Sequence, residues 1–155
     1  MASHQNGTAT YNPPQTSRPK RAPTGDEEAG AVLRLGEFQD VPTLSLSEAR
    51  LLISAVSATR KESKKKPVQT ETLDQVVEYL DLFSRFKPQD KINQLEQLLS
   101  QTNLDKYEKS QLSNLCPADV EEARTLISSL TEDKISSEDL DNILNEMRDL
   151  RRFTT

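Results

Sequence analysis

The feature that most constrains the fold is a helix-starting pattern that recurs from Ser45 onward. In this pattern a Ser or Asp is followed three residues later by Glu, so that the two side chains satisfy the first free N–H groups of a helix. It occurs at Ser45/Glu48, Asp105/Glu108 and Asp119/Glu122. Apolar residues then follow at intervals of three and four, as on one face of a helix. The sequence therefore predicts an all-α fold, a small helical bundle preceded by an extended N-terminal arm.

The apolar stripes predict which helix faces are buried. In the first helix the stripe is Ala49, Leu52, Ile53 and Val56. A second helix is expected from about Thr72 to Phe86, and further helices are expected from Pro88, Asp105, Asp119 and Ser136. The second helix is apolar over so much of its girth that we expect it to be covered on two sides. Its apolar residues are Leu73, Val76, Val77, Tyr79, Leu80, Leu82, Phe83 and Phe86.

The only cysteine, Cys116, precedes Pro117 at a junction between two expected helices. A residue before proline is driven out of the α region, so the fourth helix should stop there. Cys116 has no second thiol or histidine with which to share a metal, and the single histidine, His4, lies in the N-terminal tail. No phosphate-binding glycine loop is present either. We therefore expect no catalytic residues, metal or cofactor, and interpret Cys116 as a small buried apolar side chain.

Residues 1–30 contain almost no aliphatic side chains, so they cannot offset the entropy of ordering and are expected to be a disordered tail. The tail includes a short basic cluster of Arg18, Lys20 and Arg21. Such a cluster suits a nuclear import signal or a phosphate contact, and the plain alternative is a solvated tail.

Residues 31–45 form the extended arm. Val32, Leu33, Leu35 and Phe38 are spaced too irregularly for a helix and predict one short strand. A lone strand is not stable, and no second strand is evident in the sequence. Either the arm adds a strand to the sheet of a partner protein, or it wraps over the helices of its own chain.

The expected organisation is a tail (1–30), the partner-docking arm (31–45), a first helix with a basic linker (46–67) and a C-terminal helical bundle (68–155). The net charge of −5 argues mildly against a general nucleic-acid binder. One cysteine and no apolar run of about 20 residues indicate a soluble intracellular protein that is not embedded in a membrane.

Five stretches, taken in order, resemble a known family. They are LRLGEF (33–38), LSEARLLI (46–53), FSRFK (83–87), the stretch 114–130 that begins NLCP, and the stretch 140–153 that ends LRRF. Over about residues 31–153 the chain resembles the family of the smaller stalk subunit of RNA polymerase II, its fourth subunit. It departs from that family at Ser128, where proline is common, and residues 1–30 have no counterpart.

The resemblance implies a non-catalytic nuclear protein, with shuttling to the cytoplasm as an added expectation. Members form a heterodimer with the seventh subunit, which carries an oligonucleotide-binding barrel, and the pair lies near the RNA exit channel. Their bundle is similar to the helicase-and-RNase-D C-terminal type, and they support initiation and recruit transcript-processing factors. The implied partners are the seventh subunit, the polymerase core, nascent RNA and mRNA-processing factors. On this basis we expect partner-binding residues at Val32, Leu33, Leu35, Phe38, Leu52 and Ile53.

Two alternatives stay open. The chain could be a free-standing helical module that binds nucleic acid, although its acidity and the lack of an aromatic stripe on a basic face disfavour this. It could also be the equivalent stalk subunit of another nuclear RNA polymerase.

Overall fold

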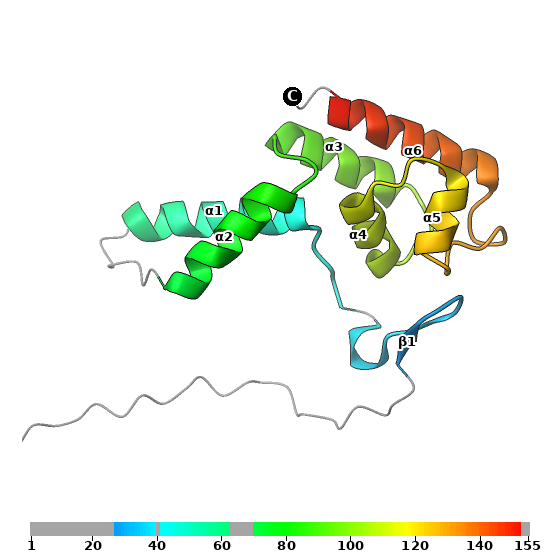
Figure 1. The fold of residues 1–155 in the computed structure, drawn as a ribbon, viewed down its shortest axis with the longest axis horizontal. Coiled ribbons are helices and arrows are strands. Elements are labelled where there is room, and N and C mark those ends of the chain that lie inside the picture. The colour runs from blue at the N-terminus through cyan, green and yellow to red at the C-terminus, as the bar shows by residue number, and fades with distance from the viewer. Residues whose placement is uncertain (1–26, 40, 63–69, 153–155) are drawn as a thin grey trace, which may run out of the picture.

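The computed structural model describes residues 27–39, 41–62 and 70–152 (Figure 1). Helices dominate these residues, and the only strands among them form one small ladder, so the expected all-α bundle is confirmed. The elements are β1 (Glu28–Ala29), β2 (Leu33–Arg34), the 3-10 turn η1 (Gly36–Phe38), α1 (Leu46–Glu62), α2 (Glu71–Phe83), α3 (Gln89–Ser100), α4 (Lys106–Leu115), α5 (Val120–Leu126) and α6 (Ser137–Arg152).

The helices fall into two groups. Helices α1 and α2 pack side by side as a helical hairpin that projects from the rest of the chain (Figure 1). The C-terminal group is built on α6, which packs against α3 and α5, and α1 also contacts α3. No helix in the described part of the chain has the length and apolar character that crossing a bilayer requires.

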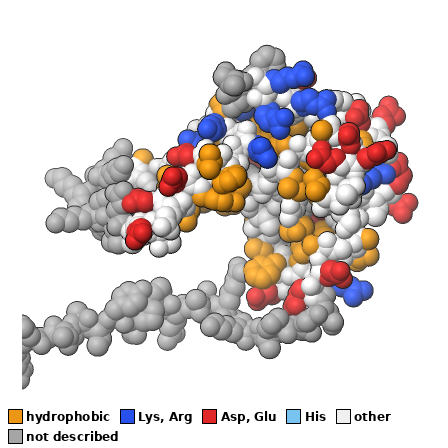
Figure 2. All heavy atoms as spheres, viewed as in Figure 1, with side chains coloured by type: hydrophobic (Ala, Val, Ile, Leu, Met, Phe, Trp, Pro, Cys, Tyr) orange, Lys and Arg blue, Asp and Glu red, His pale blue; other side chains and the backbone are white. Residues whose placement is uncertain are grey.

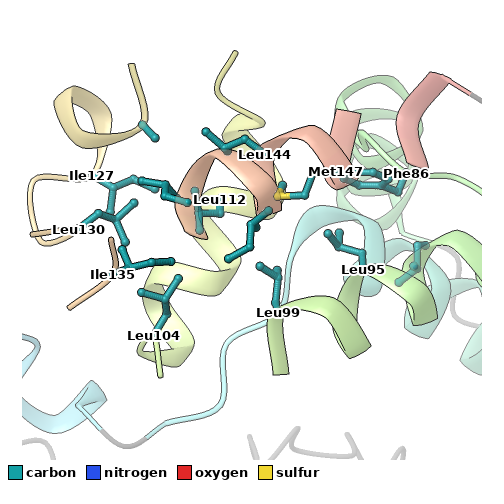
Figure 3. Close-up of a cluster of buried hydrophobic side chains, with 14 residues drawn as sticks. Phe86, Leu95, Leu99, Leu104, Leu112, Ile127, Leu130, Ile135, Leu144 and Met147 are labelled. Atoms are coloured by element: carbon teal, nitrogen blue, oxygen red, sulfur yellow. The ribbon is translucent and has the colours of Figure 1, made fainter. Parts of the chain in front are cut away.

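One apolar core holds the C-terminal group together (Figure 3). Phe86, Leu112 and Leu140 at its centre have no exposed surface. Burying a side chain of this size stabilises the fold by roughly 1.5–3 kcal/mol. The cluster comprises Phe86, Ile92, Leu95, Leu99, Leu104, Leu112, Ala123, Ile127, Leu130, Ile135, Leu140, Ile143, Leu144 and Met147.

The helix starts follow the capping pattern in the sequence. At α1, the backbone N–H of Ser45 donates to Glu48 Oε2 over 2.6 Å and the N–H of Glu48 donates to Ser45 Oγ over 3.2 Å. The corresponding capping box of α4 joins Asp105 and Glu108. At α5 the side chain of Asp119 accepts from the N–H of Glu122 over 2.8 Å. These local signals were sufficient to place three of the helix starts.

Two helices are shorter than their apolar spacing suggested, because intervals of three and four continue to Phe86 beyond α2 and to Leu130 beyond α5. Helix α2 ends at Phe83, because Ser84 turns the chain into an extended conformation that carries Phe86 into the core. Helix α5 ends at Leu126, so Ile127 and Leu130 reach the core from a turn. In both cases tertiary packing of an apolar side chain outweighs continuation of the helix.

The expectation that Leu33 has no partner strand in this chain was wrong. Strand β1 pairs antiparallel with β2, with Glu28 opposite Arg34 and Ala29 opposite Leu33. The pairing begins inside the segment 1–30 that we expected to be a disordered tail. Sequence reasoning missed β1 because two residues, one of them Glu, carry no alternating apolar pattern.

Candidate partner-binding site

The three most recognisable sequence stretches meet at one junction between the helical hairpin and the C-terminal core. The backbone N–H of Phe86, in FSRFK, donates to Ser47 Oγ at the start of α1 over 3.1 Å. Asn114, at the end of α4, accepts from the N–H of Leu46 through Oδ1 over 2.9 Å. The backbone carbonyl of Asn114 accepts from Arg85 Nε over 3.4 Å. These bonds fix the hairpin on the core, which indicates a structural role for the motifs.

Cys116 belongs to this junction as well. Its thiol donates to the carbonyl of Ser113 over 3.3 Å and packs partly buried against the core. Burial raises the pKa of the Cys116 thiol above its ordinary value of 9.0, although Arg151 and Arg85 act in the lowering direction. A thiol with a raised pKa is a poor nucleophile. Among the described residues no group of His, Cys, Asp and Glu could hold a metal.

Cys116 also has a left-handed backbone conformation, with φ of 49°. This conformation ends α4 and redirects the chain into the buried Pro117. A non-glycine residue is strained by about 1 kcal/mol or more at such a position. Glycine would remove the strain but would lose the side chain that packs on the core. The expected corner between two helices is therefore confirmed, with Cys116 as its cap.

Apolar side chains that the core leaves exposed gather on α2. Val76, Tyr79, Leu82 and Phe83 lie on adjoining positions of the helix, and we call this set the α2 outer face. Leu82 is 73% exposed, and the rings of Tyr79 and Phe83 pack on each other with centroids 4.6 Å apart. Figure 2 shows apolar side chains gathered on the helical hairpin.

The expectation that α2 is covered on two sides was wrong for this chain by itself. Leu80 is the buried residue of α2. The outer face has no cover among the described residues. The wide apolar surface of this helix was the sequence signal for these residues. It would have identified them as partner-binding residues if we had expected another protein to cover the second side of the helix.

Helix α1 buries a different face from the one its stripe suggested. Leu52 is 54% exposed, Val56 is exposed and Ile53 is half-buried. Ser47 and Leu51, four residues apart, point inward instead, because Ser47 bonds Phe86 and Leu51 packs on the core. Arg50, on the adjoining position, pairs with Asp81 of α2 over 2.5 Å. Leu52 thus stays available to a partner, and Ile53 only in part.

The four apolar arm residues are all accessible to some degree. Val32 is 71% exposed and Phe38 is 56% exposed, whereas Leu33 and Leu35 are half-buried. Strands β1 and β2 pack chiefly on each other. The end of the arm is tied to α4, where Thr43 Oγ1 donates to the carbonyl of Lys106 over 2.7 Å.

Of the six predicted partner-binding residues, the four arm residues lie in one short segment that contains β2 and η1. The other two, Leu52 and Ile53, lie apart from them on α1. Arg18, Lys20 and Arg21 lie outside the described residues.

Comparison with known proteins gives a consistent result. The family model described as RNA polymerase Rpb4 matches residues 43–151. The chain is 40% identical to DNA-directed RNA polymerase II subunit rpb4 of Schizosaccharomyces pombe over 129 residues, which cover 82% of this chain and 94% of the relative. It is 29% identical to DNA-directed RNA polymerase II subunit 4 of Arabidopsis thaliana over 133 residues, covering 83% and 96%. The Saccharomyces cerevisiae subunit RPB4 is 41% identical over 78 residues, covering 50% of this chain and 35% of the relative.

Proposed function

Because the chain belongs to the RNA polymerase Rpb4 family, we propose that it is a non-catalytic stalk subunit of nuclear RNA polymerase II. In this proposal it forms a heterodimer with the seventh, barrel-containing subunit near the RNA exit channel. The heterodimer contacts the polymerase core, supports initiation and recruits factors that process the transcript. The Schizosaccharomyces pombe and Arabidopsis thaliana relatives, which the chain matches over 94% and 96% of their length, support membership of the polymerase.

The observation that carries the proposal is the α2 outer face. Side chains as large as Leu82 and Phe83 are left in water, although the same chain buries a full core elsewhere. Contiguous apolar residues on a soluble protein mark an interaction site. Each large side chain would contribute roughly 1.5–3 kcal/mol if a partner removed it from water. A permanent subunit has such a face, and a free monomeric module has little use for one.

The arm offers a second contact of a different kind. The ladder of β1 and β2 involves only two residue pairs, and among the described residues neither strand pairs with a further strand on its outer edge. A sheet edge of the partner would pair with one of these edges and cover Val32 and Phe38 in one step. Leu33, Leu35 and Leu52 extend the proposed contact, with Ile53 at its margin.

The non-catalytic role has support from the junction. The thiol of Cys116 donates a hydrogen bond to the carbonyl of Ser113, and its pKa is raised. The carboxylates of Glu48, Glu108 and Asp119 serve as helix caps. These four polar groups therefore serve to build the fold.

The experiment that tests the proposal is affinity purification of the full-length chain from nuclear extract, followed by mass spectrometry. RNA polymerase II subunits, with the seventh subunit the most abundant, are the expected result. Subunits of another nuclear polymerase in their place, or none at all, would contradict the proposal.

A matched pair of variants connects the interaction with the α2 outer face. Leu82→Asp should reduce recovery of the seventh subunit. Leu126→Asp, which changes a 51% exposed leucine on α5, should not. Equal recovery with both variants would remove the α2 outer face from the interface.

A further inference from the structure

We propose that three arginines at the α4–α5 corner form a binding site for a phosphorylated peptide, in which a phosphoserine or phosphothreonine dianion is the anchoring group. These residues are Arg85, Arg148 and Arg151, and we call them the corner arginines. The proposal does not depend on membership of the polymerase.

The corner arginines come from two distant parts of the sequence and converge on five consecutive residues, 114–118. Arg85 precedes α3 and donates to the carbonyl of Asn114 over 3.4 Å. Arg148, on α6, donates to the carbonyl of Ala118. Arg151, one turn further on, lies close enough to Cys116 that its charge acts to lower the pKa of that thiol. Three guanidinium groups are thus gathered around one turn of backbone.

The acceptors of these arginines are neutral, and the nearby Glu122 carboxylate instead accepts from the backbone N–H of Ala118 over 2.6 Å. Some other cations of the described residues pair with carboxylates, as Arg50 does with Asp81 and Arg124 does with Glu132. No carboxylate of the described residues lies within 4.0 Å of a corner arginine. The nearest acid in sequence, Asp149, lies 3.9 Å from Arg152 at the rim. A local positive surface therefore exists on a chain whose net charge is −5.

Figure 2 shows this surface as basic side chains gathered over the end of α6 and the start of α3. Arg85 and Arg151 are exposed and Arg148 is half-buried, so the guanidinium groups are accessible to a ligand. Exposed Lys87 lies two residues beyond Arg85. The corner itself is held by the left-handed Cys116 and the buried Pro117. Groups that are already in place lose less freedom when a ligand binds.

The arrangement suits a phosphate monoester better than a nucleic-acid strand. A monoester carries about −1.5 to −2 charges and three acceptor oxygens at one point, and planar guanidinium groups bind such oxygens in pairs. A single-stranded nucleic acid needs a basic track together with aromatic rings on which bases stack. Residues 108–152 contain no aromatic side chain, and Phe86 beside Arg85 is fully buried. Clusters of arginine are the common mode of phosphopeptide recognition.

The test is a fluorescence anisotropy titration of the full-length chain with three labelled probes. These are a flexible peptide of about ten residues with one phosphoserine, its unphosphorylated twin, and a single-stranded RNA of about ten nucleotides. The phosphopeptide should bind at least about tenfold more tightly than its twin, since a charge-assisted contact is worth about a factor of ten or more. Equal binding of the twin, or tighter binding of the RNA, would overturn the proposal.

A matched pair of variants places the site. Arg151→Gln should weaken phosphopeptide binding about tenfold, whereas Lys106→Gln, which removes one exposed charge outside the corner, should not. The double variant Arg85→Gln/Arg151→Gln should bind the phosphopeptide no more tightly than the wild-type chain binds the unphosphorylated twin. Arg85 also bonds the corner, so circular dichroism must first show that the double variant is folded. Unchanged binding by folded Arg151→Gln, or equal loss in Lys106→Gln, would exclude the corner arginines.

Discussion

The ammonium nitrogen of Lys134 lies 2.7 Å from Oε1 of Glu108, a carboxylate whose side chain has no exposed surface. The same ammonium lies 2.7 Å from Oδ2 of Asp105, the N-cap of α4. Glu108 also accepts from the backbone N–H of Asp105 through its other oxygen, over 2.8 Å. One buried carboxylate therefore completes the cap of α4 and binds a cation from the turn before α6.

Lys134→Met should destabilise the fold by roughly 2 kcal/mol, because it leaves the charge of Glu108 buried without a cation. The loss of stability should be smaller than for a fully buried ion pair. The Lys134 side chain is 33% exposed, so water can replace part of the interaction with Glu108. Urea denaturation measures the difference. Lys109→Met is the control: its ammonium donates to the neutral carbonyl of Thr102 over 3.1 Å, so its loss should cost less. An equal loss in both variants would contradict this account.

The same contact predicts a pH dependence. Burial lowers the pKa of Lys134, but the hydrogen bonds and charges of Asp105 and Glu108 outweigh it, so the pKa is raised above its ordinary value of 10.5. A raised pKa means that the folded state holds the proton more tightly than the unfolded state does. The stabilisation is thus fully present below pH 10.5 and is lost as pH rises through the folded value. The difference between wild type and Lys134→Met should shrink above that pH, and a constant difference would argue against it.

This ion pair also shows where sequence reasoning stops. The capping box of Asp105 and Glu108 is local, so its spacing of three was sufficient to predict it. Lys134 lies 26 residues from Glu108, and no local pattern connects them. The junction of Ser47 with Phe86, 39 residues apart, was missed for the same reason. Local signals were thus sufficient to predict the helices, whereas contacts between residues far apart in the sequence could be identified only from the structure.

The candidate site shows the same limit. The apolar spacing of α2 identified its large side chains, but it could not tell cover by the same chain from cover by another protein. Helix α1 was assigned the wrong inner face because a serine, Ser47, takes a core-facing position by bonding Phe86. An analysis of hydrophobic periodicity treats Ser47 as polar and therefore cannot predict that it faces the core.

Cys116→Ser should leave assembly with the partner unchanged and cost about 1–2 kcal/mol of stability, since a hydroxyl is less well suited to a partly apolar site. The wild-type thiol should also react slowly with iodoacetamide at neutral pH, because its raised pKa keeps it protonated. Mass spectrometry of the folded chain and of the chain in urea measures the two rates. Loss of assembly by a folded Cys116→Ser variant would show that the thiol does more than cap α4.

Removing residues 1–26 should not prevent assembly. This stretch contains few apolar side chains, so it cannot contribute much interface energy. The truncation should stop before Glu28, because β1 pairs with the arm. Nuclear import should slow if Arg18, Lys20 and Arg21 form an import signal, which localisation of a fluorescent fusion measures. Failure of the truncated chain to co-purify with the seventh subunit would assign binding to the tail.

The arm makes the sharpest prediction. Its ladder has two residue pairs, too few for independent stability, and Val32 and Phe38 remain mostly exposed. A partner sheet edge would complete the backbone pairing and remove these side chains from water. Leu33→Asp together with Leu35→Asp should therefore abolish recovery of the seventh subunit, while circular dichroism of the helices stays unchanged. Leu126→Asp supplies the control for adding charge at an apolar position away from the arm. If the double variant binds like wild type, the arm serves only its own chain. If the helices melt as well, Leu33 and Leu35 belong to the folding core, and docking through the arm is excluded.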